Sequence, residues 1–287
     1  MSEVHEKMPE PLPSDWDKPF QETADFVQRH IVPMYLLGGG ELKLERTGVL
    51  FQIAGHKFII TAAHNLRDYD PKEIIPCFAH GKETQFPIPF SEATFYYTES
   101  NEIRSVRDIA AIKLTESQIE NIPDYWQFLS MPQVGHDSEI DDSFYFVMGF
   151  PSHQKWYAQE NWRDPKPLPY ATRITNPESS KIFDPKVHLA LSFNRQAVPL
   201  ASKDGSSHPI TLPRIQGMSG CGIWKVFPAG IAPNNWNIRH VRLVGIQNRC
   251  KHDEYILGTQ IRWVLHRLVD DFPEIKNALQ ISYRSGY

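Results

Sequence analysis

The chain has 287 residues, of which 41% are hydrophobic and 22% charged, a composition typical of a globular protein with one large core or two smaller ones. Its formal net charge of −4 argues against a nucleic-acid-binding protein, which would carry a basic surface. The sequence contains no apolar run of membrane-spanning length, so we expect neither a nucleic acid nor a membrane as a partner.

The N-terminal region predicts a tail followed by a short helix. Residues 1–18 are rich in charge and proline and contain no apolar run of signal-peptide length, so we expect a flexible tail. In residues 19–44, four apolar side chains recur at helical spacing before Pro33, which predicts an amphipathic helix and a lead-in to the main fold. These side chains are Phe20, Ala24, Val27 and Ile31.

Short β-rich runs separated by turn residues follow the helix, among them VLFQI, KFIITAA, TFYYT and IAAIKL. Regular short strands with few helical patterns are typical of β-barrels and β-sandwiches. We assign residues 45–130 to a first barrel and residues 131–258 to a second one. The segment 115–140 lacks strand alternation, and we expect it to cross between the barrels with a helical turn near Glu116 to Asn121.

The second half continues with strand-like runs, SFYFVMGFPS, VHLALSFN, GIWKVF and RHVRLVGIQNR. Aromatic and basic residues alternate between 152 and 185, where they could stack nucleotides or grip a peptide. Acidic residues and prolines in the same stretch favour a solvated surface loop instead. Residues 259–287 predict a C-terminal helix with Thr259 as its N-cap, followed by a tail. Its apolar stripe consists of Ile261, Val264, Leu265, Leu268 and Phe272.

The cysteine and histidine content indicates a reducing compartment and no metal. Three cysteines, Cys77, Cys221 and Cys250, are too few for the disulfide framework of a small secreted protein and predict free thiols in a cytoplasmic protein. A single bridge between Cys221 and Cys250 remains an alternative. The 12 histidines show no doubled zinc-ligand spacing and no H-E-x-x-H, so we expect no metal and no cofactor.

The segment RIQGMSGCGIW, residues 214–224, predicts a nucleophile turn. Ser219 lies between glycines, which allow a sharp backbone turn and let neighbouring N–H groups converge on one point. The N–H groups of Gly217 and Ser219 are the natural donors to an oxyanion formed when Ser219 attacks a carbonyl. A serine among glycines is more often an ordinary tight turn, so this segment alone is weak support.

Two further segments supply the groups that a serine nucleophile needs. His64 follows the strand-like run KFIITAA, and Asp108 precedes the strand-like run IAAIKL. A histidine can take the serine proton at neutral pH, and a buried carboxylate fixes the histidine tautomer. The order His64, Asp108, Ser219 along the chain is that of the chymotrypsin arrangement, and it differs from the orders in subtilisin and the α/β-hydrolases.

The segments TAAH, DIAAIKL and GMSGCG resemble the three signature segments of trypsin-like serine peptidases, and the resemblance covers about residues 45–270. It implies an all-β fold of two six-stranded antiparallel β-barrels with a C-terminal helix. It also implies that His64 is the general base, Asp108 its orienting carboxylate and Ser219 the nucleophile, with Gly217 and Ser219 forming the oxyanion hole. The strand VGIQNR corresponds to the wall of the specificity pocket in this family.

The wall candidates on that strand are Gly245, Gln247 and Asn248. No acidic residue stands in ITLPRIQ, the run before the nucleophile, so a preference for cutting after Lys or Arg finds no support. A small or apolar residue at the cut site is the expectation that remains.

The sequence departs from the secreted family members at two positions. Met218 stands where they often carry an aspartate that pairs with a newly freed N-terminus, so activation by trimming is not expected. Cys221 stands where they usually carry glycine, which raises the alternative of a distorted oxyanion hole. The lack of such an activation switch makes the chain more similar to the bacterial and HtrA-like branch, without a PDZ domain.

Two functions of different classes follow from the sequence. The first is an intracellular serine endopeptidase that acts on a protein or peptide substrate through an acyl-enzyme. The second is a trypsin-fold binding or effector module in which the triad is idle or awaits a regulatory protein partner. An esterase with the same triad would differ only in the acyl group that it transfers.

Overall fold

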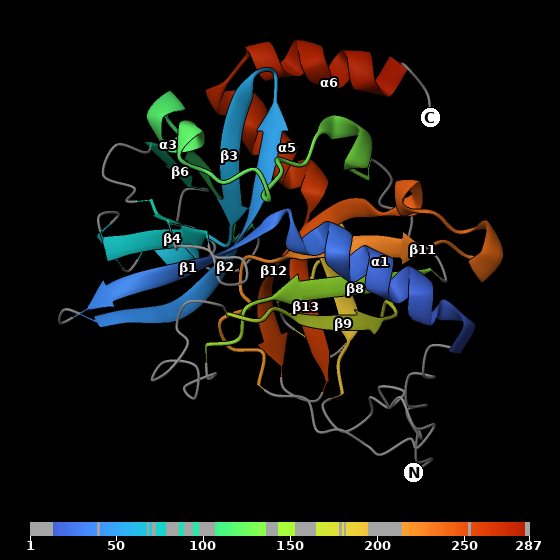
Figure 1. The fold of residues 1–287 in the computed structure, drawn as a ribbon. Helices are drawn as coiled ribbons and strands as arrows, with labels where there is room; N and C mark the ends of the chain where they lie inside the picture. The colour runs from blue at the N-terminus through green and yellow to red at the C-terminus, as the bar shows by residue number, and fades with distance from the viewer. Residues whose placement is uncertain are drawn as a thin grey trace.

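The computed structural model describes residues 14–38, 41–67, 69–70, 73–78, 86–88, 94–97, 107–135, 143–152, 165–177, 180, 182–194, 214–251 and 254–284. Strands dominate these residues and form two antiparallel sheets that share a core (Figure 1). The all-β class predicted from the short strand-like runs is therefore confirmed. Among these residues, no helix combines the length and the apolar character that crossing a membrane requires.

The first sheet has seven strands in the order β5-β4-β1-β2-β3-β7-β6. They are β1 (Ile31–Gly38), β2 (Glu41–Ile53), β3 (His56–Thr61), β4 (Ile74–Phe78), β5 (Phe86–Pro87), β6 (Thr94–Tyr97) and β7 (Ala110–Lys113). The sequence predicted six strands from residue 45 onward. The sheet differs because it begins earlier, at β1, and because the two-residue strand β5 extends its edge.

Ile31 opens β1 and does not continue the N-terminal helix, as its spacing had suggested. The helix α1 (Asp17–Gln28) ends three residues before Ile31, and the run IVPMYLLG is rich in β-branched and large apolar residues. Pro33 does not end the strand either. The neighbour β4 pairs with β1 only from Met34 onward, so Pro33 has a partner on one side only, in β2, where a proline is tolerated.

The second sheet has six strands in the order β10-β13-β12-β11-β8-β9. They are β8 (Phe144–Gly149), β9 (Leu168–Thr172), β10 (His188–Ser192), β11 (Gly222–Phe227), β12 (Arg242–Lys251) and β13 (Tyr255–Gln260). Strand β9 lies within the segment 152–185 that was predicted to be a surface loop, and it pairs along β8. The prolines of this segment hid the strand, in which Tyr170 and Thr172 are buried. Residues 153–164, the rest of that aromatic and basic stretch, lie outside the described residues.

The segment between the sheets contains the predicted helical turn. Helix α3 (Glu116–Glu120) begins at a capping box, in which Thr115 and Gln118 each satisfy the other's backbone N–H. Further along, Leu129 bridges to β2 of the first sheet and Val134 bridges to β12 of the second. The chain therefore crosses from one sheet to the other between these two residues, the interval in which the expected boundary after residue 130 falls.

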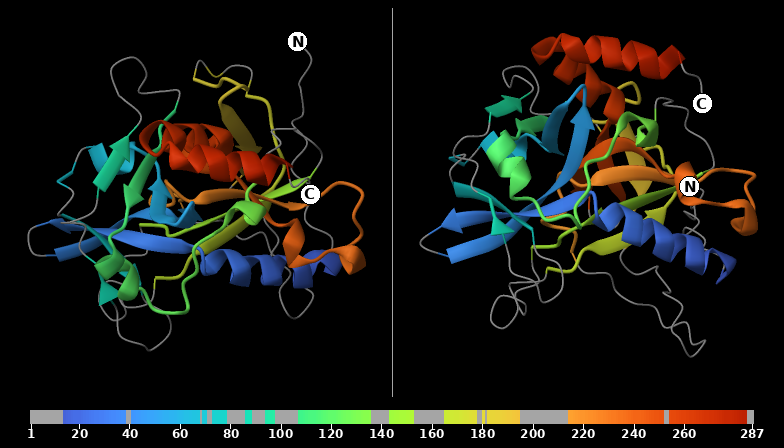
Figure 2. Two further views of the ribbon diagram at one scale, coloured as in Figure 1. Left: turned by 90° about the horizontal axis from the view of Figure 1, so that it is seen from above. Right: turned by 45° about the horizontal axis from the view of Figure 1, so that its top comes forward.

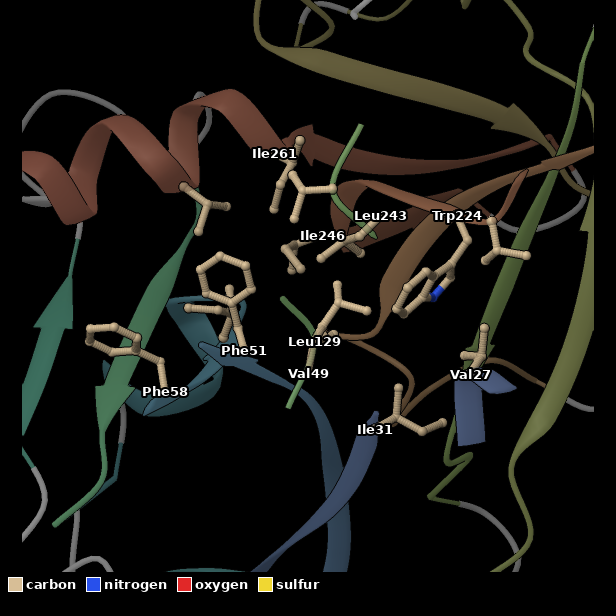
Figure 3. Packing of buried hydrophobic residues seen from close by; sticks show 14 of the residues in the cluster. Val27, Ile31, Val49, Phe51, Phe58, Leu129, Trp224, Leu243, Ile246 and Ile261 are labelled. Carbon is tan, nitrogen blue, oxygen red and sulfur yellow. The ribbon is translucent and has the colours of Figure 1, made fainter. Parts of the chain in front are cut away.

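The largest hydrophobic cluster is common to both sheets (Figure 3). Phe51 and Phe58 come from the first sheet, Trp224 and Leu243 from the second, and Leu129 from the segment between them. All five side chains are almost completely buried. Burying side chains of this size stabilises a fold by about 1.5–3 kcal/mol each, so the two sheets stabilise one another.

Helix α1 packs against the second sheet, near β8 and β11 (Figure 1). Phe20 packs edge-on against Phe146 at a ring-centroid distance of 5.3 Å, and Phe26 packs against Trp224 at 6.1 Å. Trp16, in the 3₁₀ turn Ser14–Trp16, lies 4.5 Å from Phe227. Ordered structure therefore begins within residues 1–18, the range that was expected to be a flexible tail.

Two helices end the chain and together contact both sheets (Figure 2). Helix α5 (Ile261–Asp271) packs on β12 and β13, and its N-cap is Gln260, the last residue of β13, one position after the predicted cap Thr259. Helix α6 (Glu274–Arg284) begins after Pro273, and its Glu274 carboxylate lies 2.6 Å from Nε2 of His56 on β3. The C-terminal helices thus extend from the second sheet to the first.

His30, which follows α1, is a buried histidine whose protonation opposes folding. Its Nδ1 lies 2.9 Å from the carbonyl oxygen of Phe26, and burial lowers the pKa of His30 from 6.5 to about 4 despite this hydrogen bond. Between these two values the unfolded chain binds a proton that the folded chain does not, so stability falls as the pH falls.

We expect the free energy of unfolding to drop by about 2 kcal/mol more in the wild type than in His30→Gln between pH 7 and pH 4.5. Glutamine retains an N–H donor but does not titrate. Urea unfolding at a series of pH values would measure the difference, and equal pH dependence in both proteins would contradict it.

Candidate active site

The structure brings together the three residues that the sequence predicted as a triad. Oγ of Ser219 lies 2.9 Å from Nε2 of His64, and Nδ1 of His64 lies 2.5 Å from Oδ2 of Asp108. The other carboxylate oxygen, Oδ1, accepts the backbone N–H of His64 at 2.8 Å. The His64 side chain is 39% exposed and that of Asp108 only 5%, so the base can be reached from solvent while the carboxylate is shielded.

Strand pairing explains why His64 and Asp108 meet. His64 begins the short helix α2 (His64–Arg67), three residues after the last residue of β3. Asp108 lies just before β7, and β7 pairs antiparallel with β3 so that Ala110 is opposite Thr61. The end of one strand and the start of the next therefore lie at the same edge of the sheet.

The carboxylate of Asp108 is held in its ionised form. Burial would raise the pKa of Asp108, but the hydrogen bonds from His64 and the nearby charges of His64 and Arg67 together lower it below its usual value. An ionised carboxylate accepts a hydrogen bond from the Nδ1–H of His64, which leaves Nε2 without a proton and able to accept the proton of Ser219. The arrangement can therefore support general base catalysis at the serine hydroxyl.

The orientation of the peptide bond between Gln216 and Gly217 is fixed by a hydrogen bond to Ser152, which follows β8. The Gln216 carbonyl accepts the backbone N–H of Ser152 at 2.7 Å. Because the C=O and N–H of a trans peptide point in opposite directions, the Gly217 N–H points away from Ser152. Gly217 has φ of +95°, and a Cβ there would lie 2.4 Å from the Ser152 nitrogen, so glycine is required.

The peptide bond between Met218 and Ser219 is fixed in the same way. The Met218 carbonyl accepts the Cys221 N–H at 2.9 Å, so the N–H of Ser219 points away from Cys221. Within the described part of the chain, the N–H groups of Gly217 and Ser219 have no hydrogen-bond acceptor. These are the two donors that the sequence predicted for an oxyanion hole, and both remain available beside the Ser219 hydroxyl.

The two residues that depart from the secreted family members are both buried below this turn. Met218 and Cys221 are completely buried and belong to the hydrophobic cluster of the second sheet. Met218 thus holds the turn through apolar packing at the position where an aspartate would form an ion pair. The Cys221 side chain fits without displacing the turn, since its N–H and C=O both bond to backbone groups of Met218 and Gln247.

No disulfide joins the three cysteines, all of which lie in the described part of the chain. Burial raises the pKa of the Cys221 thiol, and it raises that of Cys77 to about 12. Both are therefore unreactive thiols near neutral pH, whereas Cys250 on β12 is half-buried. The bridge between Cys221 and Cys250 that the sequence left open is absent.

The predicted wall strand is β12, but its three candidate residues have different positions. Gly245 lies in the middle of the sheet, paired with β11 on one side and β13 on the other. Gln247 uses its backbone to hold the nucleophile turn, through its N–H to Cys221 and its C=O to Gly220. Asn248 alone faces the nucleophile, because its carbonyl oxygen lies 3.4 Å from Oγ of Ser219.

The pairing of β12 changes at Asn248. Pairing between β11 and β12 ends at Gly222 opposite Ile246, whereas β13 pairs with β12 as far as Lys251. Residues 248–251 therefore have a strand partner on one side only among the described residues. A register shift in the pairing with β13 lies between Gln247 and Arg249, directly at this point.

Three further polar residues of the site were not predicted from the sequence. Thr47, Thr61 and Asn65 lie in the first sheet or beside it, are completely buried, and form hydrogen bonds that reach the nucleophile turn. Thr61 begins the TAAH segment and Asn65 follows it. The signal in the sequence that could have identified them is that both are polar residues next to a buried apolar run. Among the described residues, no group of three or more His, Cys, Asp or Glu side chains could hold a metal ion.

Comparison with known proteins identifies the fold. No protein-family model matches the chain, and no curated protein matches it. A similar solved structure is that of the scabies mite inactivated protease paralogue S-I1, with a TM-score of 0.54 and 13% sequence identity. The match covers 86% of this chain and 96% of the mite protein. The chain therefore has the trypsin-like, chymotrypsin fold.

Proposed function

We propose that the protein is a serine endopeptidase of the trypsin-like type. The observation that carries this proposal is the continuous hydrogen-bonded chain from Ser219 through His64 to Asp108. In the proposed reaction, Oγ of Ser219 attacks a peptide carbonyl while Nε2 of His64 takes the hydroxyl proton. The protonated His64 then gives this proton to the leaving amine. In the second step His64 takes a proton from water, which attacks the acyl-enzyme, and returns the proton to Oγ of Ser219.

The orientation of the nucleophile turn supports an enzyme over a module with an idle triad. The carbonyl oxygen of the substrate becomes negatively charged during attack, and in the proposed reaction the N–H groups of Gly217 and Ser219 stabilise it. A distorted oxyanion hole would turn the Gln216 carbonyl toward the serine, but this carbonyl is bonded to Ser152.

The position of Asn248 on β12 supports a peptide as the substrate. Its backbone carbonyl oxygen lies beside Oγ of Ser219, so an extended chain that lies along the strand at this residue would bring a peptide carbonyl to Ser219. The absence of an acidic residue in ITLPRIQ favours a small or apolar side chain at the cut site.

Two further parts of the proposal concern the branch of the family and the location of the protein in the cell. The turn is held by buried Met218, which favours the branch of the family, bacterial and HtrA-like, that needs no newly freed N-terminus. A cytoplasmic location agrees with the small number of cysteines.

Labelling with a fluorophosphonate probe would test the proposed function. We expect the wild type to be labelled at one site and Ser219→Ala not at all, with His64→Ala reduced at least about 10³-fold because it lacks the base. Ser117→Ala is a suitable control, since Ser117 lies on the exposed helix α3. Mass spectrometry of the labelled peptide would locate the probe.

Labelling that persists in Ser219→Ala, or a folded wild type that is not labelled, would contradict the proposal. The second result would favour the binding or effector module. If the wild type is labelled, a library of short peptides and esters would distinguish an endopeptidase from an esterase.

A further inference from the structure

Asn65, which directly follows the proposed base, connects the histidine turn to the nucleophile turn. Its amide nitrogen Nδ2 donates to the carbonyl oxygen of Ser219 at 2.8 Å and to Oγ1 of Thr61 at 2.9 Å. The side chain is completely buried, so both bonds are shielded from water. The reverse orientation of the amide would place Oδ1 against two oxygen atoms of which one, the Ser219 carbonyl, cannot donate.

The Ser219–Gly220 peptide is held from both sheets at once. On the side of the first sheet, its carbonyl accepts Nδ2 of Asn65 and the backbone N–H of Thr47, the latter at 3.1 Å. On the side of the second sheet, its N–H donates to the carbonyl of Gln247 at 2.8 Å. Rotation of this peptide would break all three bonds, so its orientation is determined by the docking of the two sheets.

Thr47 completes the connection on the side of the first sheet. Its hydroxyl donates to the Gly217 carbonyl at 3.1 Å and accepts the backbone N–H of Phe150 at 3.0 Å. Its own carbonyl accepts the hydroxyl of Thr61 at 2.8 Å. Thr61 thus links Thr47 to Asn65, and the three side chains form one buried network around the nucleophile turn.

From this geometry we propose that Asn65 is a positioning residue, which holds the Ser219–Gly220 peptide between the sheets and thereby sets the direction of the Ser219 hydroxyl toward His64. As a part in catalysis, this role rests on the proposed function. The Asn65 side chain bonds to the Ser219 carbonyl, whereas the carboxylate of Asp108 bonds to His64, so removal of Asn65 should disturb Ser219 and leave the His64–Asp108 pair intact.

Asn65→Asp is the sharpest test, because aspartate has nearly the same shape but its ionised carboxylate cannot donate to the Ser219 carbonyl. Asn65→Ala is the second variant, which removes the donor without adding a repulsive oxygen. Asn121→Asp is the matched control, since Nδ2 of Asn121 also donates to a carbonyl, that of Ser117, on the exposed helix α3.

The first measurement is amide hydrogen exchange at Thr47 and Gly220, whose N–H groups bond to the Ser219 and Gln247 carbonyls. We expect exchange at both to be at least about tenfold faster in the Asn65 variants, with no change in strand β3 and none in Asn121→Asp. This readout does not depend on any enzymatic activity. Unchanged exchange at both amides would overturn the inference.

The second measurement is the rate constant for fluorophosphonate labelling, with the downfield proton resonance of Nδ1 of His64 recorded in parallel. We expect labelling to slow by roughly 10- to 100-fold, while the resonance is retained. Faster exchange with an unchanged labelling rate would overturn the positioning role. A wild type that is not labelled would contradict the proposed function instead, and hydrogen exchange would then decide whether Asn65 holds the turn.

Discussion

Replacing Asp108 by asparagine is expected to reduce labelling of Ser219 and peptide hydrolysis by about 10⁴-fold while the fold is retained. The reason lies in the two bonds that the carboxylate accepts from His64. One oxygen accepts the backbone N–H at 2.8 Å, and an asparagine must use its only oxygen there, because an NH₂ group in that place would face another donor. Its NH₂ group then faces Nδ1, which must lose its proton.

The consequence for His64 is the wrong tautomer. With Nδ1 accepting, Nε2 carries the proton and donates toward the Ser219 hydroxyl instead of accepting from it. Rates of labelling and hydrolysis would measure the loss, and circular dichroism would check the fold. Asp25→Asn, on the exposed face of α1, is the control for the change of charge. A loss of less than tenfold would show that Asp108 does not orient the base.

Gly220→Ala is expected to cost roughly 2–6 kcal/mol of unfolding free energy, through backbone strain and overpacking together. Gly220 has φ of +94°, which a residue with a Cβ rarely adopts. A Cβ at this position would also lie 2.0 Å from Oγ1 of Thr61 and 2.1 Å from the Thr47 carbonyl oxygen. The turn would have to move away from the first sheet, so labelling of Ser219 should be lost as well.

Gly55→Ala separates the two causes. Gly55 has a similar φ of +82°, but no atom outside its immediate neighbours lies within 4 Å of a Cβ placed there. This variant should cost only the strain, about 1–2 kcal/mol, and should leave labelling unchanged. Urea unfolding of both variants would measure the difference, and equal costs would show that the contacts with Thr47 and Thr61 do not matter.

The strands were predictable wherever apolar runs were bounded by turn residues, as in β3, β8 and β11. Errors arose where one residue satisfied two patterns. Ile31 continued a helical spacing but opens β1, and Thr259 had the chemistry of an N-cap but is part of β13. In both cases pairing with a distant strand decided the structure, and such pairing is not visible in a local window of sequence.

The three triad residues could be predicted because each lies beside a strand or turn that is recognisable in the sequence. Asn65 could not be predicted as a partner of Ser219, since the two are 154 positions apart and no sequence pattern links them. The wall of the proposed substrate site was uncertain for a similar reason. The register shift after Gln247 determines which residue faces Ser219, and such a shift depends on how β12 packs between its neighbours.

Because the largest hydrophobic cluster contains residues of both sheets, formation of the candidate site is coupled to the packing of one sheet on the other. Phe51 and Trp224 come from different sheets but belong to one buried cluster, so neither half can complete its core alone. His64 and Asp108 belong to one half and Ser219 to the other, and the peptide next to Ser219 is oriented by groups from both. Folding of such a chain should be cooperative, and the hydrogen bonds that join Ser219 to His64 and Asn65 can form only when the halves dock. If Ser219 is labelled as proposed, labelling would report completed folding of the whole chain, and separately expressed halves would be labelled only after recombination.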